Sequence, residues 1–320
     1  MTELIRDLLK YVRAGALQVV VLPRIRDKRQ LSRFEYTRKA YLNILDQLNA
    51  LSEHSRVNVF TSEGYDWQAW SGSIRNAFQD KVPLAFLWQP VIAKTMVFGG
   101  LRDIEATRRR IEFVLSVYGE EIARRLLRED YIGLPKITNA HYLTSANRAH
   151  HAYHLASYQN ATKKSLFDSR CVVEWGGGYG DMARIVRRLN GQTTYIIIDL
   201  PELCALQYIY LSSVESEESV NLVVPGSEIL SGRINIVSVV SVLLEKIQIS
   251  GEAFISTWAL TESSEESQLW VFNRNFFNAD RILMAYSTDA NNRLKDVLLE
   301  VGCMQRPITL LKGRNEYAFR

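Results

Sequence analysis

The sequence predicts an α/β fold in which a mostly parallel sheet carries helices on both faces. Three observations favour this class. Residues 170–200 read as a strand, a glycine-rich turn, a helix and a second strand. Beyond residue 200, strand-like and helix-like segments alternate at lengths typical of parallel sheets. The chain then closes with two short strand-like runs on either side of Gly313, which suits an antiparallel edge.

Composition excludes several classes of protein. The chain has 320 residues, of which 47% are hydrophobic and 23% charged, enough apolar material for a large core. No run approaches the roughly 18 apolar residues of a membrane span, so we expect a cytoplasmic protein without membrane contact. The net charge of +4 is too small to indicate nucleic-acid binding. The three cysteines are scattered and show no metal-binding spacing.

The first part of the chain, residues 1–140, is expected to form a mainly helical region. Apolar residues recur at helical spacing over 3–16, 31–50 and 104–128, with an interruption near 118–119. Residues 55–90 are less periodic and rich in tryptophan, including Trp67. The sequence leaves three roles open for that stretch: a lid, a wall for an acceptor or an oligomer contact.

The second part, residues 141–320, carries the alternating pattern. A helix is expected over 144–162, with Ser145 as its N-cap. A further helix follows residue 201 and extends through residue 210, and the polar run 212–219 is expected to be a solvated loop. The remaining segments are expected strands at 220–224, 234–240, 281–286, 307–311 and 316–319, a strand that ends in a polar turn over 252–262, a short crossover at 243–247, and helices at 265–277 and 292–301.

Residues 171–199 carry the pattern of a nucleoside-binding βαβ unit. Glycines at 176, 178 and 180 allow a sharp turn off the strand and a close backbone approach to a ligand, where a Cβ would clash. Asp199 ends the second strand, at the distance typical of an acid that accepts hydrogen bonds from ribose hydroxyls. The combination is more specific than a glycine fingerprint alone, although a tight turn without a ligand is the simpler alternative.

Glu174 indicates which kind of nucleoside this unit would bind. A carboxylate beside a dinucleotide pyrophosphate would repel it, whereas a ligand with an ammonium and a sulfonium favours a carboxylate. The run Glu174-x-Gly176-x-Gly178-x-Gly180 therefore resembles the first motif of class I S-adenosylmethionine-dependent methyltransferases, with Asp199 as the ribose acid of the second motif.

Four stretches together resemble the bacterial putative sugar O-methyltransferase family over roughly residues 125–320. They are Ile132-Gly-Leu-Pro135, Glu174-Trp-Gly-Gly-Gly-Tyr-Gly180, Ile197-Ile-Asp-Leu-Pro-Glu202 and Ile255-Ser-Thr-Trp-Ala-Leu-Thr-Glu-Ser263. Leu134 stands where members often carry asparagine. The resemblance implies a class I methyltransferase fold, with a mostly parallel seven-stranded sheet whose last strand is antiparallel.

The same resemblance implies an S-adenosylmethionine-dependent O-methyltransferase acting on a hydroxyl of a sugar or sugar-like small molecule. It places Glu174 at the amino-acid end of the cofactor and Asp199 at the ribose. The predicted cofactor contacts are Glu174, Gly176, Gly177, Gly178, Asp199, Leu200 and Thr257.

Transfer to a hydroxyl needs a general base, and several side chains are candidates. His150 and His154 share one helical face just before the glycine turn, and Glu262 follows a strand at the ligand edge of the sheet. Asp181 is a weaker candidate, because an acid in the first turn of a helix commonly supports the helix. His151 is expected to point elsewhere and to be a packing residue.

Other functions remain possible at this stage. A histidine pair at i,i+4 can bind a metal, but no third ligand accompanies it, so no metal is expected. The alternatives are a nicotinamide-dependent oxidoreductase and a non-catalytic binding protein that keeps the fold. The sequence also leaves open a homo-oligomer.

Overall fold

The computed structural model describes residues 15–50, 61–62, 65–100, 103–224, 226–239, 247–288, 292–311 and 313–320. Its centre is one large sheet whose strand order is β11-β12-β10-β9-β5-β6-β8-β7. The strands are β5 (Cys171–Trp175), β6 (Thr194–Asp199), β7 (Val220–Leu222), β8 (Ile234–Ser238), β9 (Ala253–Thr257), β10 (Arg281–Ser287), β11 (Met304–Pro307) and β12 (Asn315–Phe319).

This sheet confirms the predicted fold class. Strands β7, β8, β6, β5, β9 and β10 pair in parallel, and β12 runs antiparallel to both β10 and β11. The described sheet has eight strands rather than seven, because the short β7 adds to the edge beside β8. The first strand of the closing pair lies earlier than expected, since β11 ends at Pro307.

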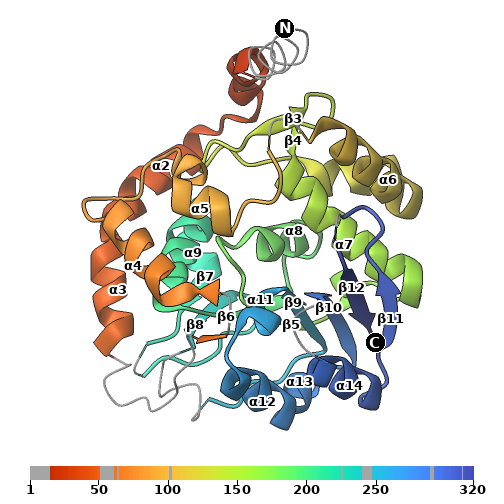
Figure 1. Cartoon of the computed structure of the whole chain (residues 1–320). Helices are drawn as coiled ribbons and strands as arrows, with labels where there is room; N and C mark the ends of the chain where they lie inside the picture. Colours follow the sequence, from red (N-terminus) through yellow and green to blue (C-terminus); the bar gives the residue numbers. More distant parts are fainter. Residues whose placement is uncertain are drawn as a thin grey trace, which may run out of the picture.

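Helices cover both faces of the sheet (Figure 1). The described helices are α2 (Lys28–Thr37), α3 (Tyr41–Ala50), α4 (Trp67–Ala77), α5 (Pro90–Thr95), α6 (Ile104–Leu127), α7 (Ala146–Thr162), α8 (Asp181–Leu189), α9 (Pro201–Val214), α11 (Ala259–Glu262), α12 (Glu265–Asn273), α13 (Asn275–Asn278) and α14 (Asn292–Glu300). Short 3₁₀ turns are η1 (Leu22–Ile25), η2 (Arg38–Ala40), η3 (Phe86–Trp88), η4 (Leu166–Asp168) and η5 (Glu217–Ser219). Two small hairpins are β1 (Thr61–Ser62) with β2 (Tyr65–Asp66), and β3 (Ile137–Asn139) with β4 (Thr144–Ser145).

The alternation of side chains along β6 explains the two layers. Tyr195 and Ile197 face a core shared with α7, α8 and α9, while Ile196 and Ile198 face a core shared with α11 to α14. The N-terminal helices join the first of these cores, in which Phe34 and Tyr41 are buried. The division at residue 140 remains a prediction, and the two parts contribute to one continuous core.

The predicted helix boundaries hold where the signal is local. Ser145 caps α7, since its Oγ accepts a hydrogen bond of 3.0 Å from the Arg148 N–H. The expected interruption at 118–119 is confirmed, because Gly119 has φ of 73° inside α6. The expected helix over 3–16 and crossover at 243–247 lie almost entirely outside the described residues.

Two predictions of secondary structure were wrong, one at residues 31–50 and one at the polar run from residue 212. The single helix expected over 31–50 is broken by η2 into α2 and α3. The polar run from residue 212 does not begin a loop, because Ser212 and Ser213 are buried in the last turn of α9. The Ser213 hydroxyl donates to the Ile209 carbonyl at 2.6 Å, so the helix itself satisfies it.

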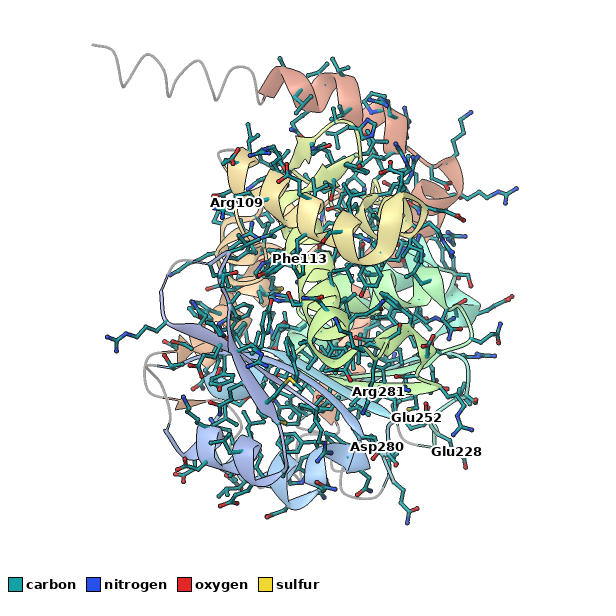
Figure 2. All side chains as sticks on the ribbon, turned by 90° about the vertical axis from the view of Figure 1, so that its right-hand side faces the viewer. Arg109, Phe113, Glu228, Glu252, Asp280 and Arg281 are labelled. Atoms are coloured by element: carbon teal, nitrogen blue, oxygen red, sulfur yellow. The ribbon has the colours of Figure 1, made fainter. Side chains whose placement is uncertain are left out.

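The two ends of the sheet differ in character. Glu252, Asp280 and Arg281 gather at the amino ends of β9 and β10 (Figure 2). The carboxyl ends of β5, β6 and β9 instead open onto a cavity. None of the described helices combines the length and apolar character that crossing a membrane requires.

Candidate active site

The turn between β5 and α8 needs its glycines for packing. Gly176 has φ of 77°, and a Cβ there would lie 2.0 Å from the Cβ of Ala259. A Cβ on Gly177 would lie 2.7 Å from Cγ2 of Ile197 and 3.2 Å from Oε2 of Glu174. These positions therefore let the turn lie directly against α11 and β6.

The N–H groups of this turn bind protein atoms. The Gly176 N–H donates to the Ile198 carbonyl at 2.9 Å, and the Gly180 N–H to that of Gly177 at 2.9 Å. The Gly178 N–H donates to Oδ2 of Asp199 at 3.1 Å. These three donors close the turn internally, so they do not form the anion cradle that a pyrophosphate needs.

Asp199 is held in place by several donors. Its Oδ1 accepts from the Leu200 N–H at 2.8 Å, and its Oδ2 also accepts from Nε2 of Gln207 at 2.7 Å. Burial nevertheless dominates and raises the pKa of Asp199 to about 7. The carboxylate is thus positioned at the cavity wall and is costly to ionise while the cavity holds no cation.

Glu174 is the second buried carboxyl group. Its Oε2 accepts a hydrogen bond of 3.0 Å from the Tyr195 hydroxyl, and burial raises its pKa to about 8, with a further contribution from Asp199. Among the residues that the structure describes, neither Glu174 nor Asp199 forms an ion pair. A cation entering between these groups would stabilise the ionised form of both.

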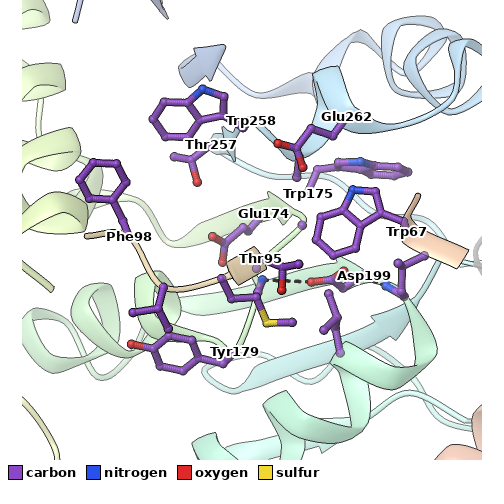
Figure 3. A pocket seen from close by; sticks show the side chains of 18 of the residues that line it. Trp67, Thr95, Phe98, Glu174, Trp175, Tyr179, Asp199, Thr257, Trp258 and Glu262 are labelled. Atoms are coloured by element: carbon purple, nitrogen blue, oxygen red, sulfur yellow. Dashed lines mark hydrogen bonds between the residues drawn. The ribbon is translucent and has the colours of Figure 1, made fainter. Parts of the chain in front are cut away.

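The cavity at this edge has a volume of about 300 Å³. Figure 3 shows Glu174 and Asp199 on its floor, Phe98 on one side and Trp67 with Glu262 on the other. All seven predicted cofactor residues line it: Glu174, Gly176, Gly177, Gly178, Asp199, Leu200 and Thr257.

The N-terminal region supplies one wall of this cavity, through Trp67 of α4 and the segment 94–98. The Phe98 N–H donates to Oδ1 of Asn147 at 2.7 Å, which fixes the segment to α7. A Cβ on Gly178 would be 3.7 Å from Cγ of Met96, so this segment lies directly over the glycine turn. Sequence reasoning missed Met96, Phe98 and Asn147, because no motif marks them.

Trp258 closes the cavity above β9. Its φ is 64°, an uncommon backbone conformation for a bulky residue, and its Nε1 donates to Oδ1 of Asn315 at 3.1 Å. Its ring stacks with that of His150 at a centroid distance of 5.7 Å, and the Phe98 ring also stacks with that of His150, at a centroid distance of 3.8 Å. Aromatic faces thus line this end of the cavity.

Only one of the two predicted catalytic histidines lines the cavity. His150 lines it, whereas His154 lies behind His150 and does not. The two Nε2 atoms are 3.0 Å apart, and Nδ1 of His154 is 2.6 Å from the Tyr317 hydroxyl. Burial, reinforced by nearby Arg110, holds the pKa of both imidazoles well below the usual range. The pair is therefore neutral at physiological pH.

His151 lies at the cavity wall, contrary to the prediction that it points elsewhere. Its Nδ1 is 2.7 Å from Oδ2 of Asp181, and its side chain is 17% exposed. Asp181 itself is fully buried and paired with Nη2 of Arg148 at 2.8 Å, so it does not reach the cavity. α7 is buried over most of its surface, which is why its helical periodicity did not reveal the orientation of His151.

Glu262 lies in α11 and lines the same cavity, on the other side from Phe98 (Figure 3), and Trp67 hydrogen-bonds its carboxyl group. Burial raises the pKa of Glu262 to about 7. Within the described residues, no group of three or more histidine, cysteine or acidic side chains has an arrangement that could hold a metal ion.

Comparisons with known proteins give the context of this fold. No protein-family model and no curated protein matches the sequence. Among solved structures, the chain is similar to an O-methyltransferase family protein from Burkholderia thailandensis, with 15% identity, a TM-score of 0.36 and coverage of 100% of this chain and 98% of that one. The chain is also similar to the pyocyanin biosynthetic protein PhzM, with 14% identity, a TM-score of 0.36 and coverage of 100% of this chain and 99% of PhzM. The structure of PigF with SAH matches with 13% identity and a TM-score of 0.34, and the matched region covers 51% of this chain and 59% of PigF. Likenesses of this size do not determine an activity.

Proposed function

We propose that the protein is an S-adenosylmethionine-dependent O-methyltransferase acting on a hydroxyl of a sugar or sugar-like small molecule. The observation that carries this proposal is the pair of buried carboxyl groups, Glu174 and Asp199, in one cavity beside a turn with internally bonded N–H groups. Such a cavity favours a cationic nucleoside and disfavours a pyrophosphate.

The residues present fit this cofactor. Glu174 would accept the ammonium of the amino-acid end, and Asp199 the ribose hydroxyls. Leu200 and Val239, at the carboxyl ends of β6 and β8, offer apolar surface for a purine. When bound, the cofactor supplies an electrophilic methyl group, and the protein supplies orientation and removal of the acceptor proton.

The acceptor end of the cavity combines aromatic and polar surface. Trp67, Phe98 and Trp258 contribute aromatic rings to its lining, and Thr257 and Glu262 contribute oxygen-bearing side chains. The apolar faces of a sugar ring pack well on aromatic rings, while its hydroxyls need such polar partners. Of the predicted catalytic residues His150, His154 and Glu262, the first and last reach the cavity.

Calorimetry tests the cofactor assignment. The protein should bind S-adenosylmethionine and S-adenosylhomocysteine, and Asp199→Ala should weaken both by about 10-fold or more, the loss of a buried charged hydrogen-bonding group. NADH under the same conditions should not bind. Tight NADH binding, or S-adenosylhomocysteine affinity unchanged in the variant, would contradict the proposal.

Transfer of a labelled methyl group tests the acceptor class. Nucleotide sugars and methyl glycosides should become labelled, and simple phenols of similar size should not. Labelling of phenols alone would support methyl transfer but contradict a sugar acceptor.

The three cysteines are free, at positions 171, 204 and 303, and we propose that the protein acts in the reducing cytoplasm.

A further inference from the structure

We infer that His151, oriented by Asp181, is the general base that removes the proton from the acceptor hydroxyl. This assignment rests on the proposed methyl transfer, and it differs from the predicted catalytic residues His150, His154 and Glu262. In this step the acceptor oxygen bonds to the methyl carbon as the carbon–sulfur bond breaks. Sulfur keeps that electron pair, and Nε2 of His151 takes the hydroxyl proton.

The geometry fixes which ring nitrogen is available. Nδ1 of His151 is 2.7 Å from Oδ2 of Asp181, a carboxylate buried behind the cavity wall. In an imidazole ring the two nitrogens point in divergent directions, so Nε2 is directed away from Asp181. Within the described residues, Nε2 has no hydrogen-bond partner. Because the His151 side chain lines the cavity, Nε2 is the atom an acceptor hydroxyl would meet.

Asp181 is suited to holding this histidine. Burial opposes its ionisation, but Arg148 and His151 outweigh burial and hold the pKa of Asp181 below its ordinary value. Arg148 reaches Asp181 at 2.8 Å and Glu129 at 3.2 Å with the same nitrogen. Asp181 therefore remains a carboxylate that fixes the tautomer of His151 and stabilises the imidazolium that proton transfer forms.

The other candidates lack such support. His150 and His154 contact each other, and His154 also contacts Tyr317. Among the described residues no carboxylate pairs with either ring, so a proton on either would be buried without a counter-charge. Glu262 can ionise near neutrality, but Trp67 holds it at the opposite rim of the cavity from Phe98, which stacks on His150 (Figure 3). Of these candidates, only His151 both lines the cavity and contacts an ionised partner, Asp181.

The kinetic test compares His151→Gln with His141→Gln, a matched change at an exposed histidine outside the cavity. The probes are methyl glycosides, UDP-glucose and 4-nitrophenol with labelled S-adenosylmethionine. In His151→Gln, kcat should fall by about 10²–10⁴-fold while the Kd for S-adenosylhomocysteine stays within about threefold. His141→Gln should leave both unchanged. In His151→Ala, added imidazole should restore part of the lost rate, which a structural role would not allow.

A second arm needs no acceptor. Diethylpyrocarbonate acylates accessible neutral imidazole nitrogens, so mass spectrometry should find His151 modified and the buried His150 and His154 protected in the folded protein. An unmodified His151, a kcat within threefold of wild type, or a loss of S-adenosylhomocysteine binding that accounts for the whole rate loss would each overturn the assignment. A wild-type protein that binds no S-adenosylhomocysteine would instead refute the proposed function itself, and this inference with it.

Discussion

Replacing Glu174 by glutamine is expected to stabilise the free protein and to weaken its binding of the cofactor. Glutamine keeps the shape of the side chain and an oxygen that accepts from the Tyr195 hydroxyl. It removes a carboxyl group whose pKa burial raises from 4.5 to about 8. The two effects have opposite signs only if the carboxylate serves a ligand rather than the fold.

The magnitude follows from the pKa. A carboxyl group with a higher pKa in the folded state favours folding through its neutral form, and this contribution is lost as pH rises from the unfolded to the folded pKa. At about 1.36 kcal/mol per pKa unit, ionising Glu174 costs roughly 3 kcal/mol at pH 7 and roughly 5 kcal/mol above pH 8. Below pH 5 the cost is under about 1 kcal/mol.

Urea unfolding at pH 5, 7 and 9 measures this difference. Glu174→Gln should match wild type at pH 5 and exceed its free energy of unfolding by a few kcal/mol at pH 9. The matched control is Glu252→Gln, because the half-buried Glu252 carboxylate pairs with Arg170 and has a lowered pKa. That change should stabilise at no pH. A Glu174→Gln protein that is less stable than wild type at pH 9 would refute the reasoning.

The same variant should lose cofactor affinity. Removing one partner of a desolvated charge pair costs about 3–5 kcal/mol, so the Kd for S-adenosylmethionine should rise by about 100-fold or more. In wild type, binding at pH 7 should release roughly one proton as Glu174 ionises and about half a proton as Asp199 ionises. Calorimetry in buffers of different ionisation enthalpy measures this release, which should fall by roughly one proton in Glu174→Gln; an unchanged release would assign that proton to another group.

Three further changes have defined outcomes. Gly176→Ala places a Cβ 2.0 Å from that of Ala259 at a positive φ, so urea unfolding should show a loss of more than about 2 kcal/mol, and an unchanged midpoint would contradict the packing. Tyr195→Phe removes the hydrogen bond that lowers the pKa of Glu174, so the pH midpoint of cofactor binding should move upward; a midpoint that stays or falls would argue against this coupling. Arg148→Met removes a guanidinium from a buried group of carboxylates and should destabilise the fold by about 3–5 kcal/mol at pH 7, measured by the same unfolding assay, whereas a neutral effect would show that those carboxylates are already protonated.

The parts of the site that sequence reasoning predicted are close together in the chain. Glu174, the glycine turn and Asp199 lie within one βαβ unit, whose geometry follows from the strand, the turn and the helix in succession. The register of β5 with β6 then brings Asp199 to the turn, where it accepts from the Gly178 N–H. Local patterning is sufficient for this half of the cavity.

The other half depends on contacts between distant segments. Met96 and Phe98 reach the cavity because Asn147 accepts from the Phe98 N–H, a contact that no pattern in the sequence indicates. A contact between distant segments also explains why the loop predicted from residue 212 was wrong. The Ser213 carbonyl accepts a hydrogen bond of 2.9 Å from Nε of Arg33, so α2 covers a helical turn whose polar composition favours exposure to solvent. Tertiary contact overrides composition at both places.

The orientation of His151 is the clearest consequence of such contacts, because it depends on how α7 sits against α8. A group of buried ions determines that position. Asp130 accepts from Nη2 of Arg188 at 2.6 Å and from Arg184 at 2.8 Å, both on α8, and lies 3.4 Å from Nη2 of Arg148 on α7.

The N-terminal helices belong to this group as well. Nε2 of Gln30, on α2, donates to Oδ1 of Asp130 at 2.9 Å, at the centre of the ion group that binds both α7 and α8. Because Arg148 of that group also holds Asp181, the angle of the His151 ring depends on residues from both parts of the chain. The helical region therefore does more than cover the cavity: through Asp130 it helps to position His151, the side chain that we propose as the general base.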